Sequence, residues 1–353
     1  MPQHILITGG AGFIGTRVAA RLLAQGHEVV LADNFHPQVH TATHHADIPA
    51  GAVVLPFDTT HRPSWDALLH RMRPNVIIHL AAETGTGQSL AEATRHSLTN
   101  VVGTTQMTDA LLAAGAAPEH IVLASSRAVY GDGEWHDQLG TFAPPPRTHE
   151  ELNAGRWNPA REGGGFATPV ASTAERTAPR PTNVYAATKL AQEHVLGAWC
   201  AATGTALSVL RLQNVYGPGQ SLGNSYTGVL TLFARLAAQR QQIDVYEDGD
   251  MLRDFVFVDD VAAAITAAAA QLPAAGRRTV DIGSGEGDTL LAVAQRIAAL
   301  RDAPLPAISG RFRDGDVRAA FCSIEAARAD LGYEPEWSLD RGLPALLDWA
   351  STQ

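Results

Sequence analysis

The chain has 353 residues, of which 45% are hydrophobic and 18% are charged, and its formal net charge is −10. This length suits one large domain or two closely joined ones, whereas the acidic balance and the lack of a basic run argue against nucleic acid or an anionic membrane as partner. Cys200 and Cys322 are the only cysteines, so neither a disulfide framework nor a cysteine-built zinc site is supported.

The chain opens on a predicted strand at residues 4–8, which leaves no room for a signal peptide. No apolar run approaches the ~20 residues that span a bilayer. The alanine-rich run 262–270 is interpreted as a buried helix. We therefore expect a soluble, cytoplasmic protein.

Short apolar runs alternate with alanine- and leucine-rich helical patterns, such as residues 16–26, which end on Gly26. This alternation is typical of an α/β fold, here a Rossmann-type, doubly wound parallel sheet with helices on both faces. The predicted strands are 4–8, 27–32, 52–57, 76–81, 120–125 and 206–212.

A glycine-rich turn, TGGAGFIG (8–15), follows the first predicted strand and opens a helix. Gly9 and Gly12 let the turn form and the backbone approach a pyrophosphate, and Gly15 allows close packing of helix and strand. Asp33 ends the second strand, where a carboxylate binds the adenosine ribose hydroxyls. Because an acid there repels a 2′-phosphate, NAD is predicted rather than NADP.

Polar residues after the second and third strands leave more than one interpretation open. Asp58 suits either a hydrogen bond to the adenine amine or a cap on the next helix. Four histidines, His36, His40, His44 and His45, are interpreted as a solvated loop, because neither carboxylates nor cysteines complete a metal-ligand set at credible spacing.

Residues 132–182 interrupt the pattern. They are rich in Pro, Gly and Thr and show no sustained period. A loop of this length inside a compact domain is usually a lid, a binding insertion or a disordered segment.

The helical pattern 183–194 puts Tyr185 and Lys189 one turn apart on a single face. Lys189 is the only lysine in the chain. Tyrosine has a pKa of about 10, and a nearby ammonium together with an oxidised nicotinamide favours the phenolate. Lys189 would thus make Tyr185 a base near neutral pH and would hold the nicotinamide ribose. Ser126, at a strand end, would donate a hydrogen bond to the substrate oxygen as charge develops.

The regular alternation ends after Tyr216. We predict a NAD-binding Rossmann domain and a smaller α/β domain that binds the substrate. The first would span 1–216, with the insertion 132–182 and a return at 252–272; the second would comprise 217–251 and 273–353.

The motifs resemble, in their order, the extended short-chain dehydrogenase/reductases, and within them the NAD-dependent nucleotide-sugar epimerase/dehydratase family. They are TGGAGFIG, Asp33, HLAAET, ASSRAVYG, YAATK and RLQNVYGPG, and the resemblance covers about residues 4–350. It implies tightly bound NAD, a nucleoside-diphosphate-sugar substrate, and a catalytic set of Ser126, Tyr185 and Lys189. It also implies a homodimer formed through two helices per subunit, here about 90–113 and 185–202.

The resemblance further implies two sets of contacts. Arg253 matches the family's diphosphate-binding arginine, and Arg313 and Asp316 match an arginine and an acid near the nucleotide; a rim salt bridge or a helix-end charge is the alternative for these three. Glu83 and Thr84 either touch the sugar or cap the following loop. The cofactor contacts are Gly9, Gly12, Phe13, Ile14, Gly15, Asp33, Asn34, Asp58, Ala81, Ala82, Asn100, Tyr185 and Lys189. The substrate contacts are Glu83, Thr84, Ser126, Arg127, Asn214, Arg253, Arg313 and Asp316.

The two residues that directly follow the catalytic serine, Ser126, argue against an elimination of water. Dehydratases of this family place Asp-Glu there, to protonate the leaving hydroxyl and take the C5 proton. Here Arg127 and Ala128 stand in these positions, and neither can serve as a general acid or base at neutral pH. The remaining chemistry is hydride removal at C4 and its return to the opposite face, which is 4-epimerisation through a 4-keto intermediate.

More narrowly, AAETGTGQS (81–89), the insertion and FRDGDVR are similar to bacterial dTDP-L-rhamnose 4-epimerase-like proteins, which implies a dTDP-6-deoxyhexose substrate. Members of that subgroup often carry a cysteine-containing, zinc-ribbon-like insertion. Residues 132–182 contain no cysteine, so no metal is expected and the implied substrate is less well supported.

Other functions stay open at this point. One is oxidative decarboxylation of UDP-glucuronate, with Arg127 facing the C6 carboxylate; another is a 4-ketosugar reductase. A non-catalytic NAD-binding sensor is the third, although such proteins usually lose the tyrosine or the lysine.

Overall fold

The structure is a computed structural model that describes residues 2–40, 48–221 and 228–352. Its largest sheet has seven parallel strands in the order β14-β9-β5-β4-β1-β2-β3. The Rossmann-type α/β fold and all six predicted strands are confirmed. The strands are β1 His4–Thr8, β2 Glu28–Asp33, β3 Val53–Pro56, β4 Val76–His79, β5 His120–Ser126, β9 Ala206–Leu212 and β14 Arg277–Ile282.

Helices cover both faces of this sheet, because its central strands carry buried apolar side chains on both sides. One face packs against α1 (Phe13–Ala24), α9 (Val258–Ala270) and α11 (Glu325–Leu331), and the other against α2 (Arg62–Arg71), α5 (Gly103–Ala113) and α7 (Val184–Thr203). Fully buried side chains such as Met107 and Leu196 contribute about 1.5–3 kcal/mol each.

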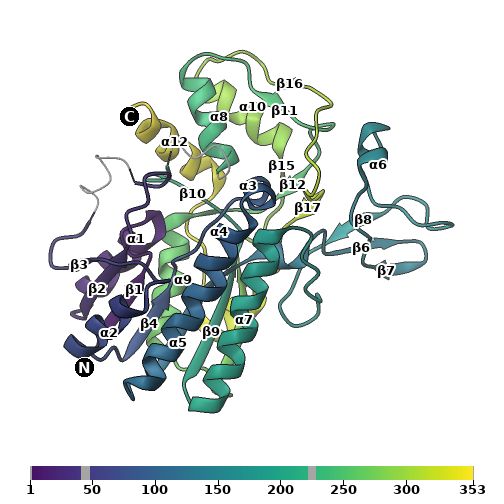
Figure 1. The fold of residues 1–353 in the computed structure, drawn as a ribbon. Coiled ribbons are helices and arrows are strands. Elements are labelled where there is room, and N and C mark those ends of the chain that lie inside the picture. The colour runs from purple at the N-terminus through teal and green to yellow at the C-terminus, as the bar shows by residue number, and fades with distance from the viewer. Residues whose placement is uncertain (1, 41–47, 222–227, 353) are drawn as a thin grey trace.

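The helical segment in front of the sheet runs without a break from residue 93 to residue 113. It follows α3 (Thr86–Ala91) and comprises α4 (Ala93–Ser97), a π-helical turn η2 (Leu98–Val102), and α5. Figure 1 shows this segment beside α7, so the two helical segments that the sequence proposes for dimerisation are neighbours.

A smaller unit with its own core lies above the sheet in Figure 1. Its buried side chains include Phe233, Val293 and Leu346. Its helices are α8 Val229–Ala238, α10 Leu290–Leu300 and α12 Leu339–Ala350, and its short strands are β10 Asn214–Tyr216, β11 Asp244–Val245, β12 Leu252–Arg253, β13 Phe255–Phe257, β15 Asp288–Thr289, β16 Ala307–Ile308 and β17 Ala319–Ala320.

The structure corrects part of the predicted domain division. Residues 273–353 were all assigned to the smaller unit, yet β14 pairs with β9 at the edge of the large sheet, and α11 packs against β14 and α9. Of the predicted return at 252–272, only α9 packs against α1, whereas β12 and β13 lie in the smaller unit. The remaining boundaries stay a prediction.

The insertion 132–182 is a folded unit at the right of Figure 1. Strand β6 (Glu134–Asp137) pairs antiparallel with β7 (Gly140–Phe142) and β8 (Thr168–Val170). Helix α6 (His149–Asn153) begins with a capping box between Thr148 and Glu151. Strands of three or four residues are too short for an alternating pattern to stand out in the sequence, which is why these were missed.

None of the helices in the described ranges combines the length and apolarity that crossing a bilayer demands.

Candidate functional site

A cavity of about 450 Å³ opens where β1, β2, β4, β5 and β9 end. This edge is where parallel α/β sheets bind their ligands. Sixteen of the predicted site residues line it: Gly9, Gly12, Phe13, Ile14, Gly15, Asp33, Asn34, Ala81, Ala82, Glu83, Thr84, Ser126, Arg127, Tyr185, Lys189 and Asn214. Five others, Asp58, Asn100, Arg253, Arg313 and Asp316, are not among its lining residues.

The glycine turn has the geometry that a pyrophosphate site requires. Gly9 has a φ of +66°, and a Cβ there would lie 2.8 Å from the Ala81 nitrogen. A Cβ on Gly15 would lie 2.5 Å from the Gly10 oxygen. Because both contacts are with backbone, neither position has room for a side chain.

Asp33 lies at the end of β2, in the place expected for the ribose-binding acid. Its Oδ2 accepts a hydrogen bond from the Ala11 nitrogen (3.1 Å), which ties it to the glycine turn. Its Oδ1 accepts from the Phe35 nitrogen (2.9 Å) and lies 3.2 Å from His40 Nε2. The His40 side chain is 7% exposed, so its assignment to a solvated loop is wrong.

His44 and His45 lie outside the described residues. Within the described ranges, no group of three or more His, Cys, Asp or Glu side chains could hold a metal ion.

Two predicted cofactor residues have structural contacts. Asp58 is exposed and accepts hydrogen bonds from the nitrogen (2.8 Å) and hydroxyl (2.7 Å) of Thr60, whereas the N-cap of α2 is His61, so the Asp58 side chain does not cap that helix. Asn100 lies in η2; its side chain binds both backbone groups of Glu83 and donates to the Thr188 hydroxyl (2.9 Å). Asn100 therefore fixes the loop after β4 against α7, and a direct contact of either residue with the cofactor stays a prediction.

Ser126, Tyr185 and Lys189 face the same cavity from three positions. Ser126 begins the 3₁₀ turn η3 (Arg127–Tyr130), and its hydroxyl accepts from the Ala128 nitrogen (3.1 Å). Burial raises the pKa of Tyr185, while a hydrogen bond from Ser126 and the charge of Arg127 lower it. The adjacent Ser125 instead donates to Glu193 in the core (2.5 Å).

Lys189 is 2% exposed. Burial lowers its pKa to about 7, against the raising effect of the Glu193 carboxylate. Its ammonium donates to Gln192 Oε1 (2.5 Å), and the Gln192 amide donates to Thr104 Oγ1 (2.9 Å) and to His79 Nε2 (3.2 Å). Burial and the charge of Lys189 lower the pKa of His79 to about 3, so His79 is neutral and can accept that bond.

Arg127 brings a second cation to the cavity. Its Nη1 is buried and has no hydrogen-bond partner among the described residues. Burial, and then the charge of Arg253, lowers the pKa of Arg127 to about 10, while Asp316 and Asp132 oppose the shift. Buried donors are normally hydrogen-bonded, so an anionic or oxygen-bearing ligand would supply the acceptor that Arg127 Nη1 lacks.

The remaining predicted substrate residues divide into two groups. Asn214 begins β10 at the cavity wall, and Glu83 and Thr84 line the cavity on the other side; Glu83 Oε2 pairs with Arg95 (2.8 Å). Arg253 donates to the Val317 oxygen (2.8 Å), and Arg313 lies over the ring of Tyr246, 5.2 Å from its centre.

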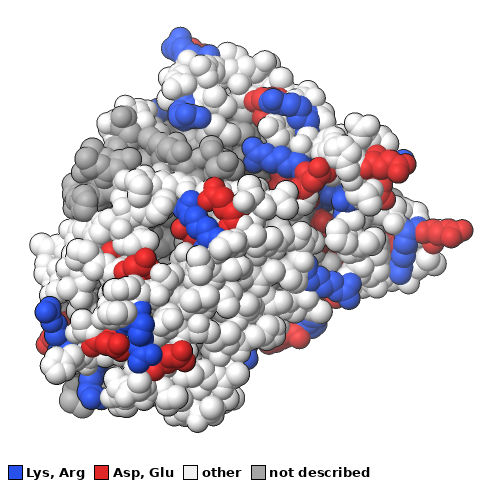
Figure 2. Space-filling model, viewed as in Figure 1, with Lys and Arg blue, Asp and Glu red and all other residues white. Residues whose placement is uncertain are grey.

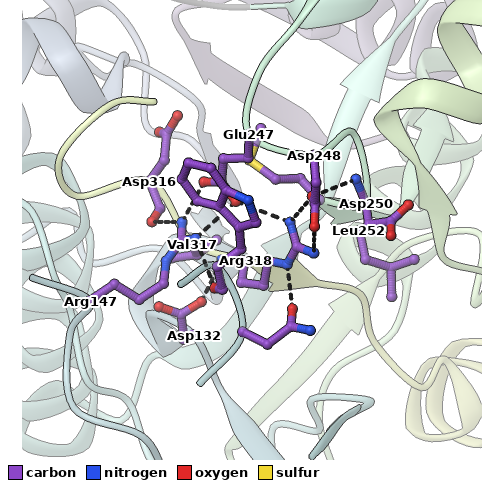
Figure 3. Close-up of polar contacts among 12 residues, drawn as sticks. Asp132, Arg147, Glu247, Asp248, Asp250, Leu252, Asp316, Val317 and Arg318 are labelled. Carbon is purple, nitrogen blue, oxygen red and sulfur yellow. Dashed lines mark hydrogen bonds and ion pairs between the residues drawn. The ribbon is translucent and has the colours of Figure 1, made fainter. Parts of the chain in front are cut away.

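Several polar residues of the region were not predicted. They are Gln192, which binds Lys189, and a buried cluster formed by Asp132, Arg147, Glu247 and Arg318 (Figure 3). Gln192 lies three residues after Lys189, on one helical face with it, which is a usable signal. The cluster joins segments up to 186 positions apart, and no local pattern announces it.

The comparisons with known proteins agree with this geometry. The model of the NAD dependent epimerase/dehydratase family matches residues 5–151 and 162–283. A dTDP-L-rhamnose 4-epimerase of Burkholderia thailandensis is 53% identical, over 99% of this chain and 96% of its own. Two solved structures cover 98% of both chains at a TM-score of 0.79: UDP-glucose 4-epimerase of Thermus thermophilus in complex with NAD (26% identity), and that of Thermotoga maritima with UDP-glucose (25% identity).

Proposed function

Because the chain belongs to the NAD-dependent epimerase/dehydratase family, we propose that it is a nucleotide-sugar 4-epimerase that interconverts dTDP-L-rhamnose and its C4 epimer. The observation that carries this proposal is the single cavity that joins the glycine turn to Ser126, Tyr185 and Lys189. Arg127 and Ala128 replace the acids that elimination requires. The relative from Burkholderia thailandensis supports the choice of sugar.

The glycine turn would hold the pyrophosphate of NAD, and Asp33 the adenosine ribose. When bound, NAD supplies a hydride acceptor at C4 and a donor for the reverse transfer. Tyr185 takes the proton of the C4 hydroxyl as the phenolate and later returns it. Ser126 donates to the same oxygen while negative charge develops there.

We propose that Lys189 favours the phenolate whenever its own ammonium is protonated. The charge of Arg127 lowers the pKa of Tyr185, and Arg127 itself stays protonated at neutral pH. Asn214 and Glu83 would contact the sugar from opposite walls of the cavity. Arg253, Arg313 and Asp316 would serve the diphosphate and the nucleotide.

We also propose a homodimer formed by the helical segment 93–113 and α7. The apolar side chains of Leu98, Val102 and Leu112 are exposed on this segment. Figure 2 shows few charged residues over the face that carries α5 and α7. We propose the cytoplasm as compartment, where NAD and nucleotide sugars are available; both cysteines are buried and unpaired.

The test is incubation of the purified protein with dTDP-L-rhamnose and no added cofactor, followed by NMR of the sugar. Interconversion of two C4 epimers in D₂O without deuterium at C3 or C5 is expected. Deuterium at C5 would instead indicate elimination or 3,5-epimerisation, and release of CO₂ from UDP-glucuronate would indicate the decarboxylase. A requirement for stoichiometric NADH would indicate the reductase.

A further inference from the structure

A buried arginine, Arg147, is one of the residues through which the insertion contacts the smaller unit. Arg147 Nη1 donates to Glu247 Oε2 (2.9 Å), and its Nη2 lies 2.9 Å from Glu247 Oε1 (Figure 3). The two side chains are only 5% and 1% exposed. A buried carboxylate is tolerated only when cations and hydrogen bonds compensate it, so the position of Glu247 depends on this contact.

The same arginine also binds the backbone of segment 316–318. Arg147 Nη2 donates to the Asp316 oxygen (2.7 Å). Arg318 binds Glu247 Oε2 from the other side (3.1 Å), and its backbone nitrogen donates to Asp132 Oδ1 (2.5 Å). Three residues of the insertion, Asp132, Arg147 and Asn158, therefore bind segment 316–318; Asn158 Oδ1 accepts from Arg318 Nε (2.7 Å).

Arg253 is held by this segment in turn. It donates to the carbonyl oxygens of Val317 (2.8 Å) and Arg318 (3.4 Å). The charges of Asp316 and Asp132 act on both Arg253 and Arg127, which places the cluster next to the cavity that Arg127 lines. A shift of segment 316–318 would thus move Arg253 and Asp316, two of the three residues proposed to bind the diphosphate and the nucleotide.

The backbone of Glu247 indicates that the surrounding contacts hold this residue in place. Its backbone has a φ of +53°, a left-handed conformation that is unfavourable for a non-glycine residue. Its nitrogen donates to the Arg311 oxygen (2.7 Å), at the start of the loop that carries Arg313. Surrounding contacts must maintain such a conformation, and Arg147 and Arg318 supply the ionic ones.

We propose that Arg147 is a positioning residue that couples the insertion to the diphosphate and nucleotide end of the substrate site. It does so by fixing Glu247 and segment 316–318, and through them Arg253 and Asp316. This inference rests on the proposed function, since it takes a nucleoside-diphosphate sugar to be the ligand.

The test compares Arg147→Met with Arg161→Met. Arg161 forms an equally close pair with Asp137 (2.6 and 2.8 Å), but this pair lies wholly within the insertion. For each variant we would measure the Kd of dTDP by calorimetry, KM and kcat for dTDP-L-rhamnose, and the NAD content per subunit. Arg147→Met should raise Kd and KM at least about 10-fold and change kcat less than about 3-fold, with NAD content unchanged. Arg161→Met should leave Kd and KM within about 2-fold.

Arg147→Lys keeps the charge but loses the paired geometry, and should recover part of the affinity. If Arg147→Met does not fold, the Arg147→Lys and Glu247→Gln variants test the proposal in its place, and both should raise Kd and KM. Unchanged dTDP affinity in folded variants would overturn the proposal, as would parallel losses of kcat and NAD content.

Wild-type protein that binds dTDP without turning over dTDP-L-rhamnose would refute only the proposed reaction, and the affinities would still test Arg147. Wild-type protein that binds none of dTDP, UDP or GDP would overturn both.

Discussion

Lys189 should make the stability of the protein depend on pH in a way that a Lys189→Met variant lacks. The pKa of Lys189 is about 7 in the folded protein, against ~10.4 in an unfolded chain. Between these values the unfolded state binds a proton that the folded state has released, so wild-type stability rises with pH. Below pH 7 both states are protonated, and the folded state then contains the buried charge at its full cost.

The size of this effect follows from the two pKa values. One proton of difference contributes about 1.4 kcal/mol per pH unit, and partial protonation at pH 7 reduces the gain from pH 7 to pH 9 to about 2 kcal/mol. Groups other than Lys189 titrate in both proteins, so the difference between wild type and Lys189→Met isolates this term.

The assay is urea unfolding of both proteins at pH 7, 8 and 9, with saturating NAD. The wild-type free energy of unfolding should rise by about 2 kcal/mol more than that of Lys189→Met over this range. Equal pH slopes would show that burial does not lower the pKa of Lys189 and would refute this reasoning.

Further expectations concern catalysis and the cofactor. Tyr185→Phe should lower kcat about 10²–10⁴-fold in the NMR turnover assay while NAD stays bound, because only the proton acceptor is lost. Arg127→Leu should move the acidic limb of the kcat–pH profile to higher pH, because the charge of Arg127 lowers the pKa of Tyr185; an unchanged limb would contradict this. Gly9→Ala should lose bound NAD and about 1–3 kcal/mol of stability, since its Cβ would meet Ala81. Gly155→Ala is the control, because Gly155 has a φ of +69° and nothing lies within 4 Å of the added Cβ. This variant should keep its bound NAD, which is measured after release by denaturation.

The fold was predictable wherever a strand is a continuous apolar run. All four residues of β4 are buried, and such runs stand out between helical patterns. Strand β14 was missed because its sequence, RRTVDI, begins with two arginines and contains a buried acid, Asp281, that binds Tyr130. Strand β14 gains its place from pairing with β9, which no local pattern records.

The residues of the candidate site were predictable where they stand at a strand end or a helix start. Ser126, Tyr185 and Asp33 stand at strand ends or at a helix start, so the topology of a parallel sheet brings them together. The contacts of Lys189 with Gln192, and of Arg147 with Glu247 100 positions away, depend on side-chain packing between elements. The prediction for His40 was wrong for the same reason, because its side chain packs against Asp33.

The single lysine has a practical consequence for chemical labelling. Amine-reactive reagents modify the unprotonated form, and burial lowers the pKa of Lys189 to about 7, which favours that form near neutral pH more than in an exposed lysine. Apart from the α-amino group that begins the chain, Lys189 is the only amine in the protein. Mass spectrometry of the labelled peptides therefore separates Lys189, inside the cavity, from the α-amino group, and bound NAD or substrate should slow the labelling of Lys189.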